Sequence, residues 1–266
     1  MNHGWQNSKK KLLPMTDQAS SQIVIVCEGP TDVRTARGFA ERILLERVGW
    51  LRNAPEALPV WSGLRKNETY LKWANVDKEF NDAGLVNVQG HYEGLPGKFD
   101  SKAARKALRL AAHHHKEAFA VVLVRDTDSQ PERREGLEQA RIEFKRLFER
   151  HTVVIGFANP KREAWVLAGF QPNSASEHEH LEDLKRENSF DPTREPHRLR
   201  SRESDSRDAK HALGRLTSND FSREEPCWSE TPLGILHANG ENCGLKAYLE
   251  EVESRLVPLF DPSLSR

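Results

Sequence analysis

Acidic side chains follow two of the most apolar runs in this sequence, at the points where the runs end. Glu28 comes directly after residues 23–27, and Asp126 and Asp128 follow residues 119–124. Carboxylate oxygens are the ligands that Mg²⁺ prefers, and a cluster of carboxylates repels itself at neutral pH unless a cation lies within it. If the fold brings these residues together, they predict a site for Mg²⁺ or Mn²⁺. An isolated Asp-x-Asp is also typical of an ordinary turn at the end of a strand.

Three apolar, β-branched runs predict the strands that position these residues. Residues 23–27, 119–124 and 151–157 have the composition of strands buried on both faces, as in a parallel sheet. Between and after them, apolar residues recur at spacings of three and four over 33–44 and 137–148, which predicts helices. The alternation indicates an α/β fold with a mostly parallel sheet and flanking helices. Ligands of such sheets bind beyond the carboxyl ends of the strands, where the acidic residues lie.

The rest of the chain is expected to surround this domain, which spans residues 22–170. Residues 1–21 are predicted to be a loose tail, and residues 49–96 an insertion that leaves the sheet. Residues 171–266 are expected to form a charged linker, flexible over about 177–223, and a helical region around 245–256 that packs back on the domain. Gly29 and Pro30 should form the turn after the first strand, with Thr31 capping the next helix.

Composition excludes several classes of protein. The 266 residues include 40 lysines and arginines and 40 aspartates and glutamates, so any contact with nucleic acid must come from local patches rather than from a global positive field. The three cysteines are an odd number without C-x-x-C spacing, which argues against a disulfide framework and a zinc site. No run of about 18 apolar residues predicts a membrane span, and no secretory segment is recognisable. We expect a cytoplasmic location.

Further candidate residues follow the third apolar run. Glu163 is a possible additional metal ligand, although an acidic residue in the first turn of a helix also interacts favourably with the helix dipole. Lys161 and Arg162 are candidates for stabilising a phosphate during its reaction.

A basic stripe precedes the second apolar run. Lys98, Lys102 and Arg105 recur at helical spacing, and a right-handed crossover would start this helix near the carboxyl ends of the strands. They are therefore candidates for nucleic acid phosphate contacts. A solvated charged face is the alternative.

At these residues the chain resembles TOPRIM domains, which topoisomerases, bacterial primases and the overcoming-lysogenization-defect nucleases share. Those domains carry a glutamate after their first strand and an Asp-x-Asp after a later one. Glu28, Gly29 and Asp32 match the first motif, and Asp126 with Asp128 matches the second. The resemblance implies a Rossmann-like TOPRIM fold, with Mg²⁺ held by the two aspartates and Glu28 acting as general acid, general base or ligand. Asp32 would have a supporting role.

The resemblance covers residues 22–157 and also implies a function. Such a domain, without room for a topoisomerase or primase module, is expected to be a metal-dependent nuclease acting on DNA or RNA. The block around Glu163 and Trp165 is similar to small TOPRIM-like proteins found beside ATPases in bacterial phage-defence loci, which implies an antiviral role and a separate ATPase partner. Two departures are a longer gap between Glu28 and Asp126 and the lack of a third acidic residue soon after Asp128, which favours one metal ion over two.

Two alternative functions stay open. The chain has no GxxxxGK[ST] motif, so it cannot hydrolyse ATP through that machinery. The first alternative is therefore a non-catalytic or partner-activated subunit of a defence complex. A phosphatase of the haloacid-dehalogenase type, with Asp126 as the nucleophile, is less favoured because Gln130 stands where that family has threonine or valine. Whether the chain forms a homo-oligomer is also open.

Overall fold

The computed structural model describes residues 22–65, 67–86, 88, 90–92, 94–115, 120–128, 130, 132–202 and 205–264. The expected amino-terminal tail, residues 1–21, lies outside the described residues. None of the described helices is both long enough and apolar enough to cross a membrane.

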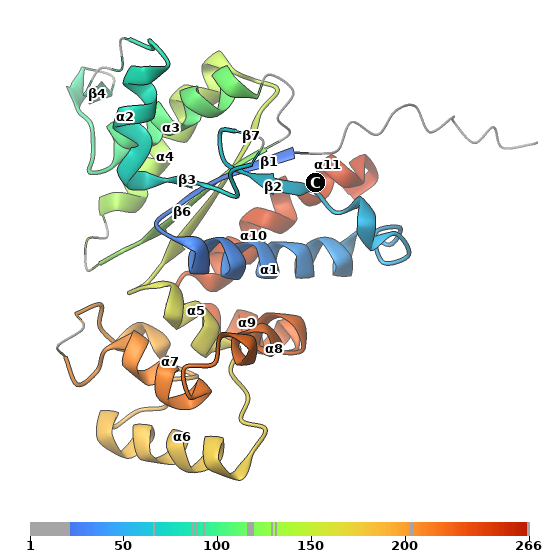
Figure 1. Cartoon of the computed structure of the whole chain (residues 1–266), viewed down its shortest axis with the longest axis vertical. Helices are drawn as coiled ribbons and strands as arrows, with labels where there is room; N and C mark the ends of the chain where they lie inside the picture. The colour runs from blue at the N-terminus through green and yellow to red at the C-terminus, as the bar shows by residue number, and fades with distance from the viewer. Residues whose placement is uncertain are drawn as a thin grey trace, which may run out of the picture.

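The centre of the molecule is a parallel sheet, which confirms the predicted α/β class (Figure 1). Its strands are β1 (Gln22–Cys27), β2 (Val60–Ser62), β3 (Leu71–Lys72), β6 (Ala120–Asp126) and β7 (Thr152–Ala158). The order is β2-β1-β6-β7, with β3 also paired to β1, and every one of these pairs is parallel. The three apolar runs of the sequence form β1, β6 and β7. These strands are apolar along most of their length because both of their faces are covered.

Helices cover both faces of the sheet (Figure 1). One face carries α1 (Pro30–Arg47) and α10 (Leu245–Arg255), and the other carries α2 (Val76–Asp82), α3 (Ser101–His114) and α4 (Glu132–Leu147). Alternate residues of β1 divide between the two apolar cores: Ile25 packs into the core with α1, and Val26 into the core with α3. The carboxyl ends of the strands are therefore left as the open edge of this three-layer unit.

The predicted insertion does not leave the sheet, so that expectation was wrong. Both β2 and β3 pair with β1, on the side away from β6, and the side chains of Trp61 and Leu71 are buried. Without these strands, the backbone N–H and C=O groups along one side of β1 would lack partners. Outside the sheet, the same segment forms η1 (Pro55–Ala57), η2 (Trp73–Asn75) and an antiparallel pair, β4 (His91–Tyr92) and β5 (Leu95–Pro96).

The charged segment expected to be flexible is instead largely helical. It contains most of α6 (Ala175–Asn188), η3 (Pro196–Arg198), α7 (Ala209–Thr217) and η4 (Phe221–Glu224). The physical reason is a sparse apolar stripe: Leu181 and Leu184 of α6 and Leu213 and Leu216 of α7 are buried, while the charges lie mostly outside.

These helices form a lobe below the open edge of the sheet (Figure 1). The lobe also contains α5 (Arg162–Ala168), α8 (Glu225–Ser229) and α9 (Leu233–Gly240). The chain then returns to the sheet through α10, as predicted for the carboxyl-terminal region, and ends with α11 (Val257–Phe260) and η5 (Pro262–Leu264).

Candidate functional site

A cavity of about 440 Å³ lies between the open edge of the sheet and the helical lobe. Carboxylates from the ends of β1 and β6 and from the first turns of α1 and α5 line it together. These are Glu28, Asp32, Asp126, Asp128 and Glu163. The three acidic residues singled out first in the sequence thus meet in one cavity, with Asp32 and Glu163 beside them.

The turn after β1 directs Asp32 back toward the strand ends. Helix α1 begins at Pro30, so that Gly29 is its N-cap residue and Asp32 lies in its first turn. The Asp32 Oδ2 atom accepts a hydrogen bond from the Gly29 N–H at 2.7 Å. The expectation that Thr31 caps this helix was wrong, because the helix begins one residue before it and Asp32 satisfies the free N–H.

The end of β6 fixes the Asp-x-Asp pair. The strand continues to Asp126, whose Oδ1 atom accepts the backbone N–H of Arg162 at 3.0 Å. Thr127 is buried, and its N–H donates to the Ala158 carbonyl at 2.8 Å, which ties the turn to β7. Asp128 follows with a φ of 45°, in the left-handed region that aspartate tolerates better than most residues. The two carboxylates therefore lie in a backbone segment anchored to the neighbouring strand.

The carboxylates disturb one another electrostatically. Burial raises the pKa of Asp126 well above its usual range, and repulsion from Asp32, Glu163, Glu28 and Asp128 adds to this. Burial, with repulsion from Glu28 and Glu163, also raises the pKa of Asp32 to about 6, although the Gly29 N–H and the Arg162 guanidinium oppose the rise. The cavity thus holds more carboxylates than it can ionise at low cost without a cation.

Two arginines already neutralise the outer carboxylates. The Nη1 atom of Arg125 lies 3.0 Å from Oε1 of Glu28, and Nη1 of Arg133 lies 3.2 Å from Oδ2 of Asp128. Asp100, the N-cap residue of α3, joins the two arginines, since its Oδ2 atom is 2.9 Å from Arg125 Nε and 3.6 Å from Arg133 Nε. This arrangement is a chain of alternating charges that joins Glu28 to Asp128, both of which line the cavity.

The possible metal ligands suit a hard divalent cation, because the described residues that line the cavity include several carboxylates but no histidine or cysteine. In the arrangement shown, however, no three His, Cys, Asp or Glu side chains of the described residues are grouped closely enough to hold one ion. To act as metal ligands, Glu28 and Asp128 would have to exchange their arginines for the metal.

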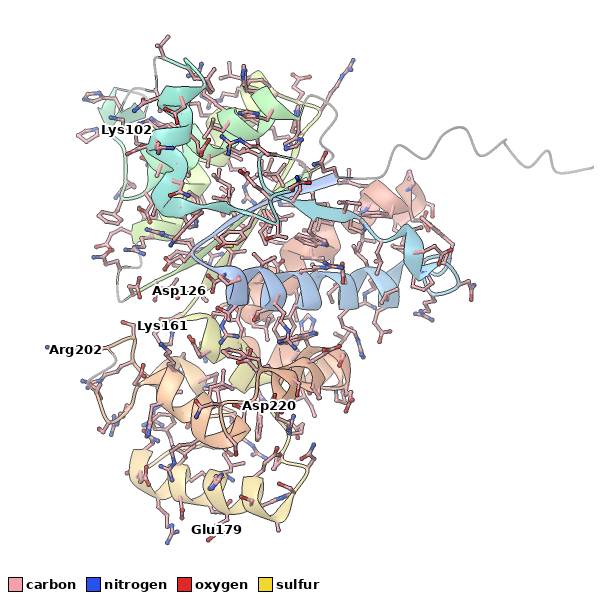
Figure 2. The ribbon with its side chains drawn as sticks, in the orientation of Figure 1. Lys102, Asp126, Lys161, Glu179, Arg202 and Asp220 are labelled. Atoms are coloured by element: carbon pink, nitrogen blue, oxygen red, sulfur yellow. The ribbon has the colours of Figure 1, made fainter. Side chains whose placement is uncertain are left out.

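Of the predicted basic residues, Lys161 and Arg162 reach the cavity. Lys161 is partly exposed there, next to Asp126 (Figure 2). Arg162 is only 5% exposed, and its Nη1 atom lies 2.6 Å from Oε2 of Glu224 and 3.1 Å from the Thr35 hydroxyl. Its guanidinium therefore joins the helical lobe to α1 and to the acidic site, and its contact with a phosphate stays a prediction.

The basic stripe, which lies on α3 and just before it, does not line the cavity. Lys98 lies 3.1 Å from Glu135, and Arg105 is 3% exposed and lies 2.8 Å from Glu143. Lys102 is exposed and appears far from Asp126 in Figure 2. In this structure Lys98 and Arg105 therefore pair with acidic residues, and Lys102 is exposed to solvent. A role of the three residues in binding nucleic acid stays a prediction.

The helical lobe supplies a wall of the cavity that sequence patterns did not indicate. Lys210, Asn219 and Phe221 belong to α7, the turn after it and η4, and all three line the cavity. The run 218–220 is typical of a turn, but nothing local shows that this turn folds against strand ends 60 or more residues earlier in the chain.

Comparison with known protein families, with curated proteins and with solved structures finds no match for this chain.

Proposed function

We propose that this protein is a Mg²⁺-dependent endonuclease of the TOPRIM type, which hydrolyses phosphodiester bonds in DNA or RNA. The observation that carries the proposal is the meeting of Glu28, Asp126 and Asp128 with Asp32 and Glu163 in one cavity. The raised pKa of Asp126 supports it, because a site that resists ionisation on its own is one that a divalent cation would stabilise.

Each group has a role that follows from its position. Asp126 and Asp128 would hold the metal, with Glu163 as a further ligand. A bound Mg²⁺ supplies polarisation of the phosphate and acidification of a water molecule. The Glu28 side chain is 41% accessible, against 36% for Asp128 and 14% for Glu163, which suits a group that accepts a proton from water or completes the metal shell. Lys161 at the cavity offsets charge on the phosphate.

The test compares Asp126→Asn with Asp82→Asn, a control at an exposed carboxylate of α2 that pairs with Lys78. Purified proteins are incubated with Mg²⁺ and single-stranded DNA, duplex DNA, RNA or transfer RNA. We expect the parent and Asp82→Asn to cleave at least one substrate, and Asp126→Asn to lose at least about 100-fold in rate, because metal polarisation contributes several kcal/mol. Cleavage at the parent rate by Asp126→Asn would remove the proposal.

A second readout does not depend on activity. Electron paramagnetic resonance of added Mn²⁺ reports bound ion directly, and Asp126→Asn should bind it more weakly than Asp82→Asn. Equal binding by the two variants would mean that the cavity carboxylates are not metal ligands.

The setting of this activity follows from the resemblance. We propose that the nuclease acts in the cytoplasm as an effector of antiviral defence, together with a separate ATPase. Co-expression with a neighbouring ATPase gene and recovery of a complex on a tagged chain tests the partnership, and a chain that is fully active and recovered alone would contradict it.

A further inference from the structure

An exposed aromatic ring lies at the cavity that holds the carboxylates. Phe221 lines this cavity and is 54% exposed, although phenylalanine is among the residues most often buried. It is the first residue of η4, on the helical lobe, and Asp220 just before it is labelled on that lobe in Figure 2. A flat apolar surface thus borders a site whose other side is acidic.

The backbone turn that carries this ring is fixed relative to the carboxylates. At its start, Asp220 Oδ1 accepts the N–H of Ser222 at 2.8 Å. At its end, the buried Glu224 carboxylate binds Arg162, whose own N–H donates to Asp126. One buried ion pair therefore connects the turn of Phe221 to the central carboxylate, and the backbone that carries the ring needs little ordering when a ligand binds.

The surroundings of the ring match the parts of a nucleotide. Lys161 offers a cationic head suited to phosphate, and the Asn219 amide offers both a donor and an acceptor for the edge of a base. The ring offers a face for stacking, which tolerates any base because every base has a π-face. A volume of about 440 Å³ lies within the usual range for one small ligand.

From these observations, and resting on the proposed nuclease function, we infer that the substrate is single-stranded nucleic acid, with an unpaired base stacked on Phe221 next to the scissile phosphate. In a duplex both faces of each base are covered by its neighbours. A base must then leave the stack before it reaches the ring, and this costs a few kcal/mol that a single strand does not need. The Phe221 ring therefore selects unpaired nucleotides.

The experiment measures binding separately from cleavage. Fluorescence anisotropy follows a labelled single-stranded oligonucleotide and its blunt duplex with Ca²⁺ in place of Mg²⁺. The variants are Phe221→Ala, Phe221→Leu, Phe221→Trp and a control, Leu147→Ala, which removes another exposed apolar side chain, 65% accessible, at the end of α4.

We expect the parent to bind the single strand more tightly than the duplex. Phe221→Ala should weaken single-strand binding by roughly 5- to 150-fold, the range for loss of one stacked base. Phe221→Leu should recover little of this loss and Phe221→Trp most of it, and Leu147→Ala should match the parent. Unchanged binding by Phe221→Ala, an equal loss for single strand and duplex, or tighter binding of the duplex by the parent would each overturn the inference.

Cleavage assays with Mg²⁺ on the same proteins separate the two proposals. Single-strand binding that depends on Phe221, in a protein that cleaves nothing, would remove the nuclease and keep the binding site. Cleavage that needs Asp126 but not Phe221, with binding equally indifferent to Phe221, would keep the nuclease and remove the stacking site.

Discussion

Replacing Asp32 with asparagine removes one charge from the crowded cavity while keeping an oxygen for the hydrogen bond from Gly29. The pKa of Asp32 is raised to about 6 in the folded protein, mainly by burial, from an ordinary value of 3.8. The folded state therefore binds more protons than the unfolded state between about pH 4 and pH 6. Stability must fall as the pH rises through this window, and the loss is complete above about pH 7.

The size of the effect follows from the same values. The pKa difference from 3.8 to about 6 is worth about 3 kcal/mol in total, at about 1.4 kcal/mol for each tenfold change. The part that falls between pH 5 and pH 8 is about 1 kcal/mol, since at pH 5 the Asp32 carboxyl is already mostly ionised in the unfolded state but still mostly protonated in the folded state. Asparagine carries no such charge. In the absence of metal, we therefore expect Asp32→Asn to gain about 1 kcal/mol in the free energy of unfolding, relative to the parent, on going from pH 5 to pH 8.

Urea denaturation followed by tryptophan fluorescence, with EDTA present, measures the free energy of unfolding at both pH values. Asp82→Asn serves as the control, because Asp82 is exposed and does not line the cavity, and its difference from the parent should not change between the two pH values. The expectation is contradicted if the free energy of unfolding of Asp32→Asn, taken relative to the parent, is no higher at pH 8 than at pH 5.

Two further predictions concern the arginines. Glu224→Leu leaves the buried Arg162 guanidinium without its main partner and should lower the free energy of unfolding by about 3–5 kcal/mol. Glu224→Leu combined with Arg162→Met should lose less, because no buried charge is then left without its partner. A double variant as unstable as the single one in urea denaturation would contradict this. Arg125→Met frees Glu28 from a partly exposed ion pair worth about 1 kcal/mol. It should therefore tighten Mn²⁺ binding about fivefold, as measured by electron paramagnetic resonance. Weaker binding would show that the arginine supports the metal site rather than competing with it.

The central strands were predictable because burial on both faces leaves an unbroken apolar run in the sequence. Once β1, β6 and β7 were recognised as parallel strands, the meeting of Glu28 and Asp126 followed from topology, because parallel strands end at the same edge. The short strands β2 and β3 were missed. They have three and two residues, which is too few for any period, and they include the polar Ser62 and Lys72.

The helical lobe and the charge pairs were missed for a different reason. The charge of residues 177–223 conceals the few leucines that anchor α6 and α7, so composition suggested flexibility. The pairs Arg125–Glu28 and Arg162–Glu224 join residues 97 and 62 positions apart, and no local pattern encodes such a contact. The Arg125–Glu28 pair was the least expected, because Glu28 is a carboxylate that the sequence motif predicted at the metal site.

The pairing of β2 and β3 with β1 also bears on solubility. After Gln22, β1 is a run of isoleucine and valine that ends in cysteine, and a strand of that composition with an open side would be a template for pairing with other chains. The two short strands cover its amino-terminal and carboxyl-terminal halves in turn. Strands β2 and β3 therefore cover this side of β1 against pairing with other chains, and a shortened form lacking them would expose it.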